Sequence, residues 1–176
     1  YFSSYSTFSN CEKVKRICLP KSYTGEGAGS QGVTIYKLDS CSNLEWIDVA
    51  EGNPEYQSLD GFLCTKSRFD ESEKRNEIGL EYCPIGKGEN ITIPEGITHF
   101  SRGSAFGNSE QIKRICLPKS FTDFNSGQSD KAFNTCSNLE WIDVVEGNSR
   151  LQSLDGFLCS TPSKLSYDEG TVSLVY

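Results

Sequence analysis

The chain has 176 residues, of which 36% are hydrophobic and 23% are charged, and its formal net charge is -7 at pH 7. This balance disfavours nucleic-acid binding, because phosphate contacts need lysine and arginine side chains gathered on one face. The apolar runs are only a few residues long, whereas a membrane-spanning helix needs roughly 20 apolar residues, so we expect neither a nucleic-acid partner nor membrane insertion.

Three sequence blocks occur twice, in the same order. Residues 14–22 return as 112–120, residues 41–49 return as 136–144, and residues 57–64 return as 152–159. Repetition of this density indicates that a structural unit was duplicated and stacks on its own copy. We expect a single solenoid over residues 1–176, made of two long units, about 7–82 and 105–176, which a bridging repeat at 83–104 joins.

Five short strands are predicted in chain order. In each one an isoleucine is followed two residues later by leucine, valine or isoleucine, which sends two side chains inward and the residue between them outward. The strands are centred on Ile17, Ile47, Ile91, Ile115 and Ile142. We expect them to form one parallel sheet in chain order.

The segments between the strands predict loops and hairpins. Four glycines between residues 23 and 40 indicate a flexible connection, and the matching stretch 121–135 keeps Ala132-Phe133. The Asp60-Gly61 and Asp155-Gly156 pairs indicate turns. We expect hairpins at about 59–82 and 154–176 to project from one side of the solenoid, as insertions that are not steps of the sheet.

These ordered motifs resemble the BspA-like leucine-rich repeat family. The resemblance rests on Ile-x-Leu-Pro at residues 17–20 and 115–118, on Cys-Ser-Asn-Leu-x-x-Ile at 41–47 and 136–142, and on Ile-Pro-x-Gly-Ile-Thr at 93–98. It implies an α/β-type or mostly-β solenoid with a right-handed, leucine-rich-repeat-like superhelix, a parallel sheet of short strands and hairpin insertions. It also implies surface or secreted proteins that bind other molecules, although residues 1–8 lack the pattern of a signal peptide.

The eight cysteines raise the question of disulfides. Cys11, Cys41 and Cys136 share one repeat position, with Ser109 in the fourth copy, and we expect these small side chains to point into the core. Cys18 and Cys116 should point outward on strands roughly 14 Å apart, which is too far for a bridge. The remaining plausible pair is Cys64 with Cys83 on the first hairpin, so we expect mostly free thiols and leave that pair open.

The residue inventory disfavours catalysis and cofactor binding. A serine or cysteine nucleophile usually needs a histidine base, and the single histidine, His99, lies in no recognisable constellation. The cysteine spacing does not match a zinc site, and the glycine-rich loop matches no phosphate-binding motif. We therefore predict no enzyme, no metal and no cofactor; a glycosidase using Glu45/Asp48 or Glu140/Asp143 is the least favoured reading.

The outward positions of the strands define the candidate binding face. One row holds Arg16, Trp46, Asn90, Arg114 and Trp141, and the next row holds Cys18, Asp48, Thr92, Cys116 and Asp143. Tryptophan beside arginine is typical of binding hot spots, which makes the candidate site Arg16, Trp46, Asp48, Arg114, Trp141 and Asp143. The alternative is that both indoles cover the sheet by packing against the hairpins or the arginine stems.

We interpret the chain as a non-catalytic, extracellular or cell-surface interaction or adhesion module, monomeric, that binds a protein or glycan ligand. The alternative is a structural spacer within a longer array of repeats. Asn90-Ile91-Thr92 also matches the acceptor pattern for N-glycosylation.

Overall fold

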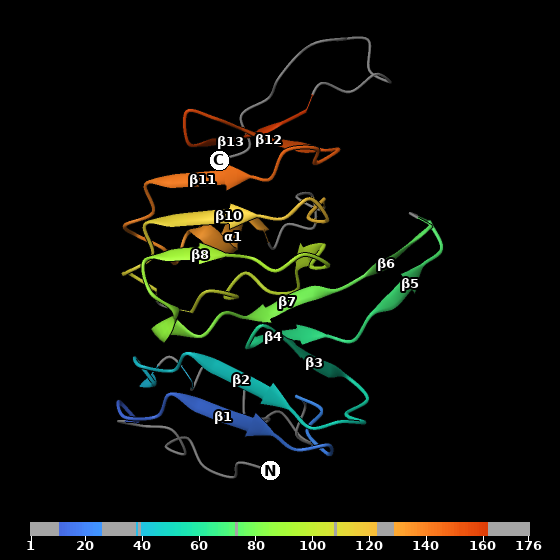
Figure 1. Cartoon of the computed structure of the whole chain (residues 1–176), viewed down its shortest axis with the longest axis vertical. Helices are drawn as coiled ribbons and strands as arrows, with labels where there is room; N and C mark the ends of the chain where they lie inside the picture. Colours follow the sequence, from blue (N-terminus) through green and yellow to red (C-terminus); the bar gives the residue numbers. More distant parts are fainter. Residues whose placement is uncertain are drawn as a thin grey trace.

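The structure is a computed structural model that describes residues 11–25, 38, 40–72, 74–107, 109–122 and 129–161. It is a β-solenoid with nearly no helix, in which successive strands stack along the long axis of the molecule (Figure 1). The fold class predicted from the sequence is therefore confirmed. The predicted flexible loop, for residues 26–37, and the last part of the second hairpin, for residues 162–176, lie outside the described residues.

All five predicted strands are present. They are β1 (Arg16–Leu19), β2 (Trp46–Val49), β8 (Asn90–Thr92), β10 (Arg114–Leu117) and β11 (Trp141–Val144). The central isoleucines of the last four strands are 3% exposed or less, and Ile17 in β1 is half-buried. Alternation of inward and outward residues therefore follows the sequence pattern.

The prediction of a single parallel sheet is wrong. β1 pairs with β2 in one parallel sheet, and β8, β10 and β11 form a second parallel sheet. The free edge of β2 faces the first hairpin, where the backbone N–H of Ile47 donates to the carbonyl oxygen of Gly61 at 2.9 Å. Because the hairpin turn takes this position, β8 does not pair with β2 and starts a new sheet.

The hairpins are part of the stack rather than lateral insertions. β3 (Tyr56–Leu59) and β4 (Phe62–Thr65) form the first one, and β4 continues into a four-stranded sheet with β7 (Gly79–Tyr82) and β9 (His99–Phe100). The second unit repeats the hairpin with β12 (Leu151–Leu154) and β13 (Phe157–Ser160). There the N–H of Ile142 donates to the carbonyl of Gly156, also at 2.9 Å, so each hairpin ends a parallel ladder.

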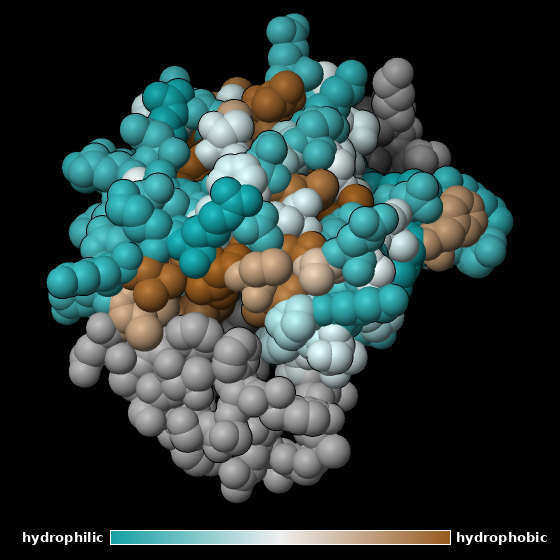
Figure 2. All heavy atoms as spheres, turned by 60° about the horizontal axis from the view of Figure 1, so that its bottom comes forward, coloured by the Kyte–Doolittle hydropathy of each residue, from teal (hydrophilic) through white to brown (hydrophobic). Residues whose placement is uncertain are grey.

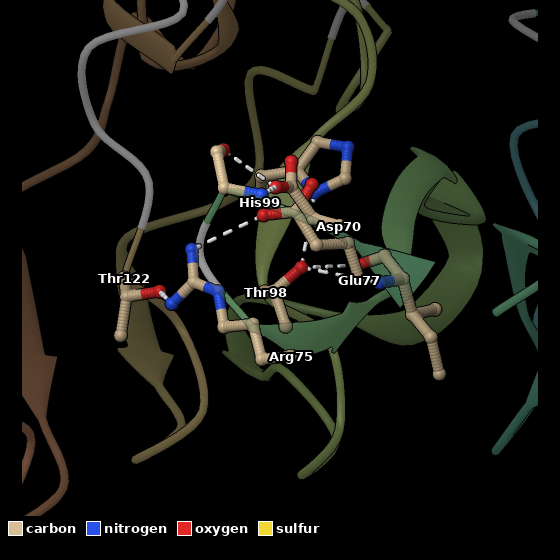
Figure 3. A network of polar contacts seen from close by, with 8 residues as sticks. Asp70, Arg75, Glu77, Thr98, His99 and Thr122 are labelled. Carbon is tan, nitrogen blue, oxygen red and sulfur yellow. Dashed lines mark hydrogen bonds and ion pairs between the residues drawn. The ribbon is translucent and has the colours of Figure 1, made fainter. Parts of the chain in front are cut away.

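One hairpin does project from the solenoid, as Figure 1 shows. It consists of β5 (Arg68–Asp70) and β6 (Arg75–Glu77). Arg75, next to the turn of this hairpin, ties it to the body by donating to the hydroxyl of Thr122, and it also donates at 3.2 Å to Glu77 of its own strand (Figure 3). The Thr98 hydroxyl accepts from the N–H of Ile78 at 3.1 Å, which fixes the strand as it returns to the solenoid.

The core forms two apolar clusters, one in each half of the stack. In the larger cluster the ring of Phe100 lies 4.6 Å from that of Phe121 and 5.4 Å from that of Phe133, measured between centroids. Phe133 ends the short helix α1 (Ser129–Phe133), and it is fully buried together with Ala132. In the view of Figure 2, hydrophilic side chains cover most of the described surface, with hydrophobic groups in patches among them.

All eight cysteines are free thiols, including Cys64 and Cys83. Cys41 and Ser109 are fully buried at the shared repeat position and Cys136 is nearly so, which confirms their inward orientation, whereas Cys11 at the same position is half-buried. Cys18 is exposed and Cys116 is half-buried, as their outward positions predict. Burial raises the pKa of Cys64 to about 12 and also raises that of Cys83.

Candidate functional site

The strand register brings the predicted site residues together in two clusters of three. Arg16 of β1 lies opposite Trp46 of β2, and Asp48 follows on the same face of β2. In the second sheet Arg114 of β10 lies opposite Trp141 of β11, with Asp143 two residues further on. We call Arg16, Trp46 and Asp48 the first cluster, and Arg114, Trp141 and Asp143 the second cluster.

The first cluster is held together by hydrogen bonds to one carboxylate. The Arg16 guanidinium donates to Asp48 through Nε at 2.5 Å and through Nη2 at 2.9 Å. The indole Nε1–H of Trp46 donates to Oδ1 of the same carboxylate at 3.0 Å. The guanidinium carbon lies 5.4 Å from the indole centroid, within the range of a cation–π contact.

The second cluster repeats these contacts. Arg114 donates through Nε to the Asp143 carboxylate, and the Trp141 indole donates to the same carboxylate at 2.9 Å. The guanidinium carbon of Arg114 lies 5.7 Å from the Trp141 centroid. Both indoles remain partly accessible, with Trp46 36% and Trp141 40% exposed. The duplication has therefore preserved the geometry of this side-chain cluster as well as its sequence.

The carboxylates are ionised at neutral pH. Hydrogen bonding from Arg16 is the main cause that holds the pKa of Asp48 below its ordinary value of 3.8, and the Trp46 indole acts in the same direction. Arg114 and Trp141 lower the pKa of Asp143 in the same way. The side chains of Arg16 and Arg114 are 65% and 53% exposed, so each cluster presents a guanidinium to solvent while its aspartate is engaged.

Each indole packs against the turn of a hairpin. A Cβ atom added to Gly61 would lie 2.5 Å from Cδ2 of Trp46, and one added to Gly156 would lie 2.6 Å from Cδ2 of Trp141. Asp60 and Asp155, which precede these glycines, have φ of 49° and 50°, as the two-residue hairpin turns that Asp-Gly favours require. The sequence predicted these turns, and their contact with the indoles is the one that the alternative reading of the tryptophans predicted.

Lys87, which the sequence did not indicate, lies beside the first cluster. Nζ of Lys87, at the end of the 3₁₀ helix Ile85–Lys87, lies 5.2 Å from the Trp46 centroid and 4.3 Å from the Phe62 centroid. It also donates to the backbone carbonyl of Asp60 at 2.7 Å. No motif could have identified Lys87, because its role depends on a contact across 41 residues with an indole.

The other outward residues lie where the register predicts. Asn90 and Thr92 are exposed in β8, and their partners in β10 are Arg114 and Cys116. His99 hydrogen-bonds through Nδ1 to the Thr98 hydroxyl at 3.0 Å, next to the base of the projecting hairpin (Figure 3). Over the part of the chain that the structure describes, no group of three or more His, Cys, Asp or Glu side chains could hold a metal ion.

These features define a repeat protein: a β-solenoid whose strands expose the same side-chain cluster twice. Residues 81–166 match the family model of the BspA type leucine rich repeat region (6 copies). This match confirms, over these residues, the resemblance to the family that the motifs predict. A comparison with curated proteins gives no significant match. Among the described residues, no helix is long and apolar enough to cross a membrane.

Three solved structures resemble parts of the chain. The pneumococcal vaccine antigen PcpA is 24% identical, with a TM-score of 0.45 over 73% of this chain and 27% of its own. A leucine-rich repeat protein from Eubacterium ventriosum is 22% identical, with a TM-score of 0.38 over 75% of this chain and 36% of its own. A leucine rich cell surface protein from Faecalibacterium prausnitzii is 17% identical, with a TM-score of 0.29 over 80% and 50%. The chain thus spans at most half the length of these proteins.

Proposed function

We propose that this chain is a non-catalytic interaction module that binds an extracellular or cell-surface partner through the two Arg–Trp–Asp clusters. The observation that carries the proposal is their duplication: the same three residue types recur on exposed strands with the same contacts. Exposed arginine and partly exposed tryptophan provide rigid contact area and directional donors, the chemistry that dominates binding hot spots. Resemblance to a leucine-rich repeat family supports a role in protein interaction.

The packing of the indoles favours a protein over a glycan as the partner. Stacking of a sugar ring needs an open aromatic face, but Gly61 and Arg16 already lie against Trp46, and Gly156 and Arg114 lie against Trp141. Both indoles and both guanidinium groups nevertheless remain partly exposed. These groups suit backbone carbonyls and acidic side chains of a protein surface.

The experiment compares binding to a panel of purified extracellular proteins and to a glycan array. Trp46→Ala and Trp141→Ala should each weaken binding to a recovered protein partner at least about tenfold. Lys66→Ala, at the base of the projecting hairpin, is the control and should leave the affinity unchanged. Circular dichroism must show that every variant is folded. A partner bound with equal affinity by the wild type and by the double tryptophan variant would contradict the proposed site.

A structural spacer is the second candidate, and one observation favours it. The polar atoms of each tryptophan and aspartate are already hydrogen-bonded within their own cluster, so the clusters also suit a purely structural role that fixes each hairpin on its sheet. Under this alternative the panel and the array yield no ligand, and the tryptophan variants lower stability alone.

A further inference from the structure

The projecting hairpin has an exposed outer strand. β5 pairs with β6 in a two-stranded sheet, and among the described residues it has no other strand partner. In Figure 1 β5 is the strand on the outer side of the hairpin, away from the stack. The side chain of Arg68 is 72% exposed and Phe69 is 56% exposed. The outer edge of such a strand offers backbone N–H and C=O groups that can pair with another strand.

Opposite charges face each other across the two strands of this hairpin. Arg68 of β5 lies opposite Glu77 of β6, and Asp70 lies opposite Arg75. Phe69 lies between the two charged residues of β5, and its side chain points to the other face because successive residues of a strand alternate. One face of the hairpin therefore carries two rows of opposite charge, and the other face carries an exposed aromatic ring.

The sequence of β5 is complementary to itself in an antiparallel pairing. About a two-fold axis at Phe69, Arg68 of one copy lies opposite Asp70 of the other, and the symmetry repeats this contact on the other side of the axis. In the same register Ser67 lies opposite Glu71, so no like charges meet. Charged side chains usually protect an edge strand from pairing, but in this order they favour one register of it, because opposite charges across two strands attract.

We propose that β5 is a self-association site, which pairs with β5 of a second copy of this chain in a four-stranded antiparallel sheet. The two β5 strands lie in the centre of this sheet, and each β6 lies outside its own β5. Each of two symmetric rows of side chains then crosses the sheet with alternating sign, from Arg75 and Asp70 of one copy to Arg68 and Glu77 of the other. The two Phe69 rings lie opposite each other on the other face, where cross-strand aromatic pairs stabilise a sheet.

The contacts that β5 makes within its own chain are compatible with this pairing. Arg68 donates to Glu55 at 2.6 Å, and the side chains of both are exposed, at 72% and 41%. An exposed ion pair adds little to stability, so Arg68 can turn to the second copy at small cost. Asp70 accepts from the N–H of Ser72 at 2.7 Å, a hydrogen bond of the turn that leaves the charge of the carboxylate in place.

The association is weak and reversible, because the contact is small. Stable interfaces bury about 1,200 Å² or more, and a contact between two strands of three residues lies well below this size. We expect a dissociation constant on the order of 1 mM. Many copies held on one surface would pair more completely, since their effective concentration is higher. This inference does not depend on the proposed function, because it uses no residue of the two Arg–Trp–Asp clusters.

The test uses two charge variants, Arg68→Asp and Asp70→Arg. In each variant alone, like charges meet across the two-fold axis, so neither should self-associate. A mixture of the two restores both contacts between opposite charges in a heterodimer. The NMR amide signals of β5 in isotope-labelled Arg68→Asp should therefore shift when unlabelled Asp70→Arg is added to about 1 mM, and unlabelled Arg68→Asp should cause no shift. Recovery on mixing also shows that both variants are folded.

The wild type provides an independent measurement. Its β5 amide signals should shift as the concentration rises to about 1 mM, whereas the NMR indole N–H signals of Trp46 and Trp141, which lie outside the contact, should stay in place. Phe69→Ala should weaken the association about two- to fivefold, because it removes the ring pair. Lys66→Ala, on the same hairpin but outside β5, is the matched control and should have no effect.

Three results would overturn the proposal. The first is a wild type whose β5 signals do not depend on concentration. The second is labelled Arg68→Asp that, with its fold verified by circular dichroism, does not respond to Asp70→Arg. The third is an equal response of labelled Arg68→Asp to both unlabelled variants, since this would mean that the contact does not join Arg68 to Asp70.

Discussion

Asn148 makes in the second unit the same hydrogen bonds that Asn53 makes in the first. The amide of Asn53 donates to the carbonyls of Pro20 and Tyr23 at 3.1 and 2.8 Å, and its oxygen accepts from two backbone N–H groups. Asn148 donates to Pro118 and Phe121 at 3.1 and 2.6 Å and accepts in the same way. Each asparagine thus connects the end of one strand to the start of a hairpin.

Asn53→Ala should destabilise the protein by about 2–4 kcal/mol, because it leaves buried backbone donors and acceptors without partners. Asn148→Ala should have a similar effect. The measurement is urea unfolding followed by circular dichroism. Asn43→Ala is the control, since this exposed asparagine makes one hydrogen bond, to the carbonyl of Glu12, and should cost less than about 1 kcal/mol. Equal losses for Asn43 and Asn53 would contradict the structural role.

Gly61→Ala should disturb the first cluster. The residue has φ of 78°, where alanine costs about 1–2 kcal/mol, and the new methyl group would displace the Trp46 ring. We expect lower stability together with a shifted Trp46 indole signal and an unchanged Trp141 signal. Gly96→Ala is the matched control, because φ there is 99° but no atom lies within 4 Å of the added methyl group. It should lower stability and leave both indole signals in place.

Cys18 should be the first thiol to react in the native protein. Cys18 is exposed, whereas the other seven cysteines, all within the described residues, are buried or half-buried. Burial raises the pKa of four of them, Cys64, Cys83, Cys116 and Cys136, and so suppresses their thiolates. A chromogenic disulfide reagent at about pH 8 should label Cys18 in a fast phase that Cys18→Ser removes. The buried thiols should react only after denaturation. A fast phase that survives Cys18→Ser would show that another thiol opens to solvent.

The sequence was sufficient to predict the strands and their outward residues, because an isoleucine pattern with a period of two fixes which side chains face the core. The register followed from the duplication, so Arg16 opposite Trp46 and Arg114 opposite Trp141 could be foreseen. The same argument identified the inward cysteine position.

The arrangement of the sheets could not be predicted in this way. Whether β2 pairs with β8 depends on where the hairpin folds back, and the hairpin is held there by hydrogen bonds of Ile47 with Gly61 and Ser58. The Lys87 contact with Trp46 has the same origin, since it requires the hairpin and the following 3₁₀ helix to meet. Such contacts between segments leave no local periodicity in the sequence.

Protonation of Asp48 and Asp143 should break the hydrogen bonds that hold the two Arg–Trp–Asp clusters together, at a pH below the ordinary pKa of aspartate. Hydrogen bonds from the arginines lower the pKa of Asp48 and Asp143 in the folded state. A carboxyl group whose pKa is lower in the folded than in the unfolded state adds stability above its unfolded pKa, near 3.8, and this contribution disappears as the pH falls through the folded pKa. Both aspartates are therefore expected to contribute fully at neutral pH.

The indole N–H signals of Trp46 and Trp141 report this titration, because each indole donates to the carboxylate in question. Both signals should move with midpoints below 3.8. In Asp48→Asn the Trp46 signal should lose its titration while that of Trp141 keeps it. The difference in unfolding free energy between wild type and Asp48→Asn should be constant above about pH 5 and shrink below it. A midpoint at or above 3.8 would mean that Arg16 does not hold Asp48 in solution.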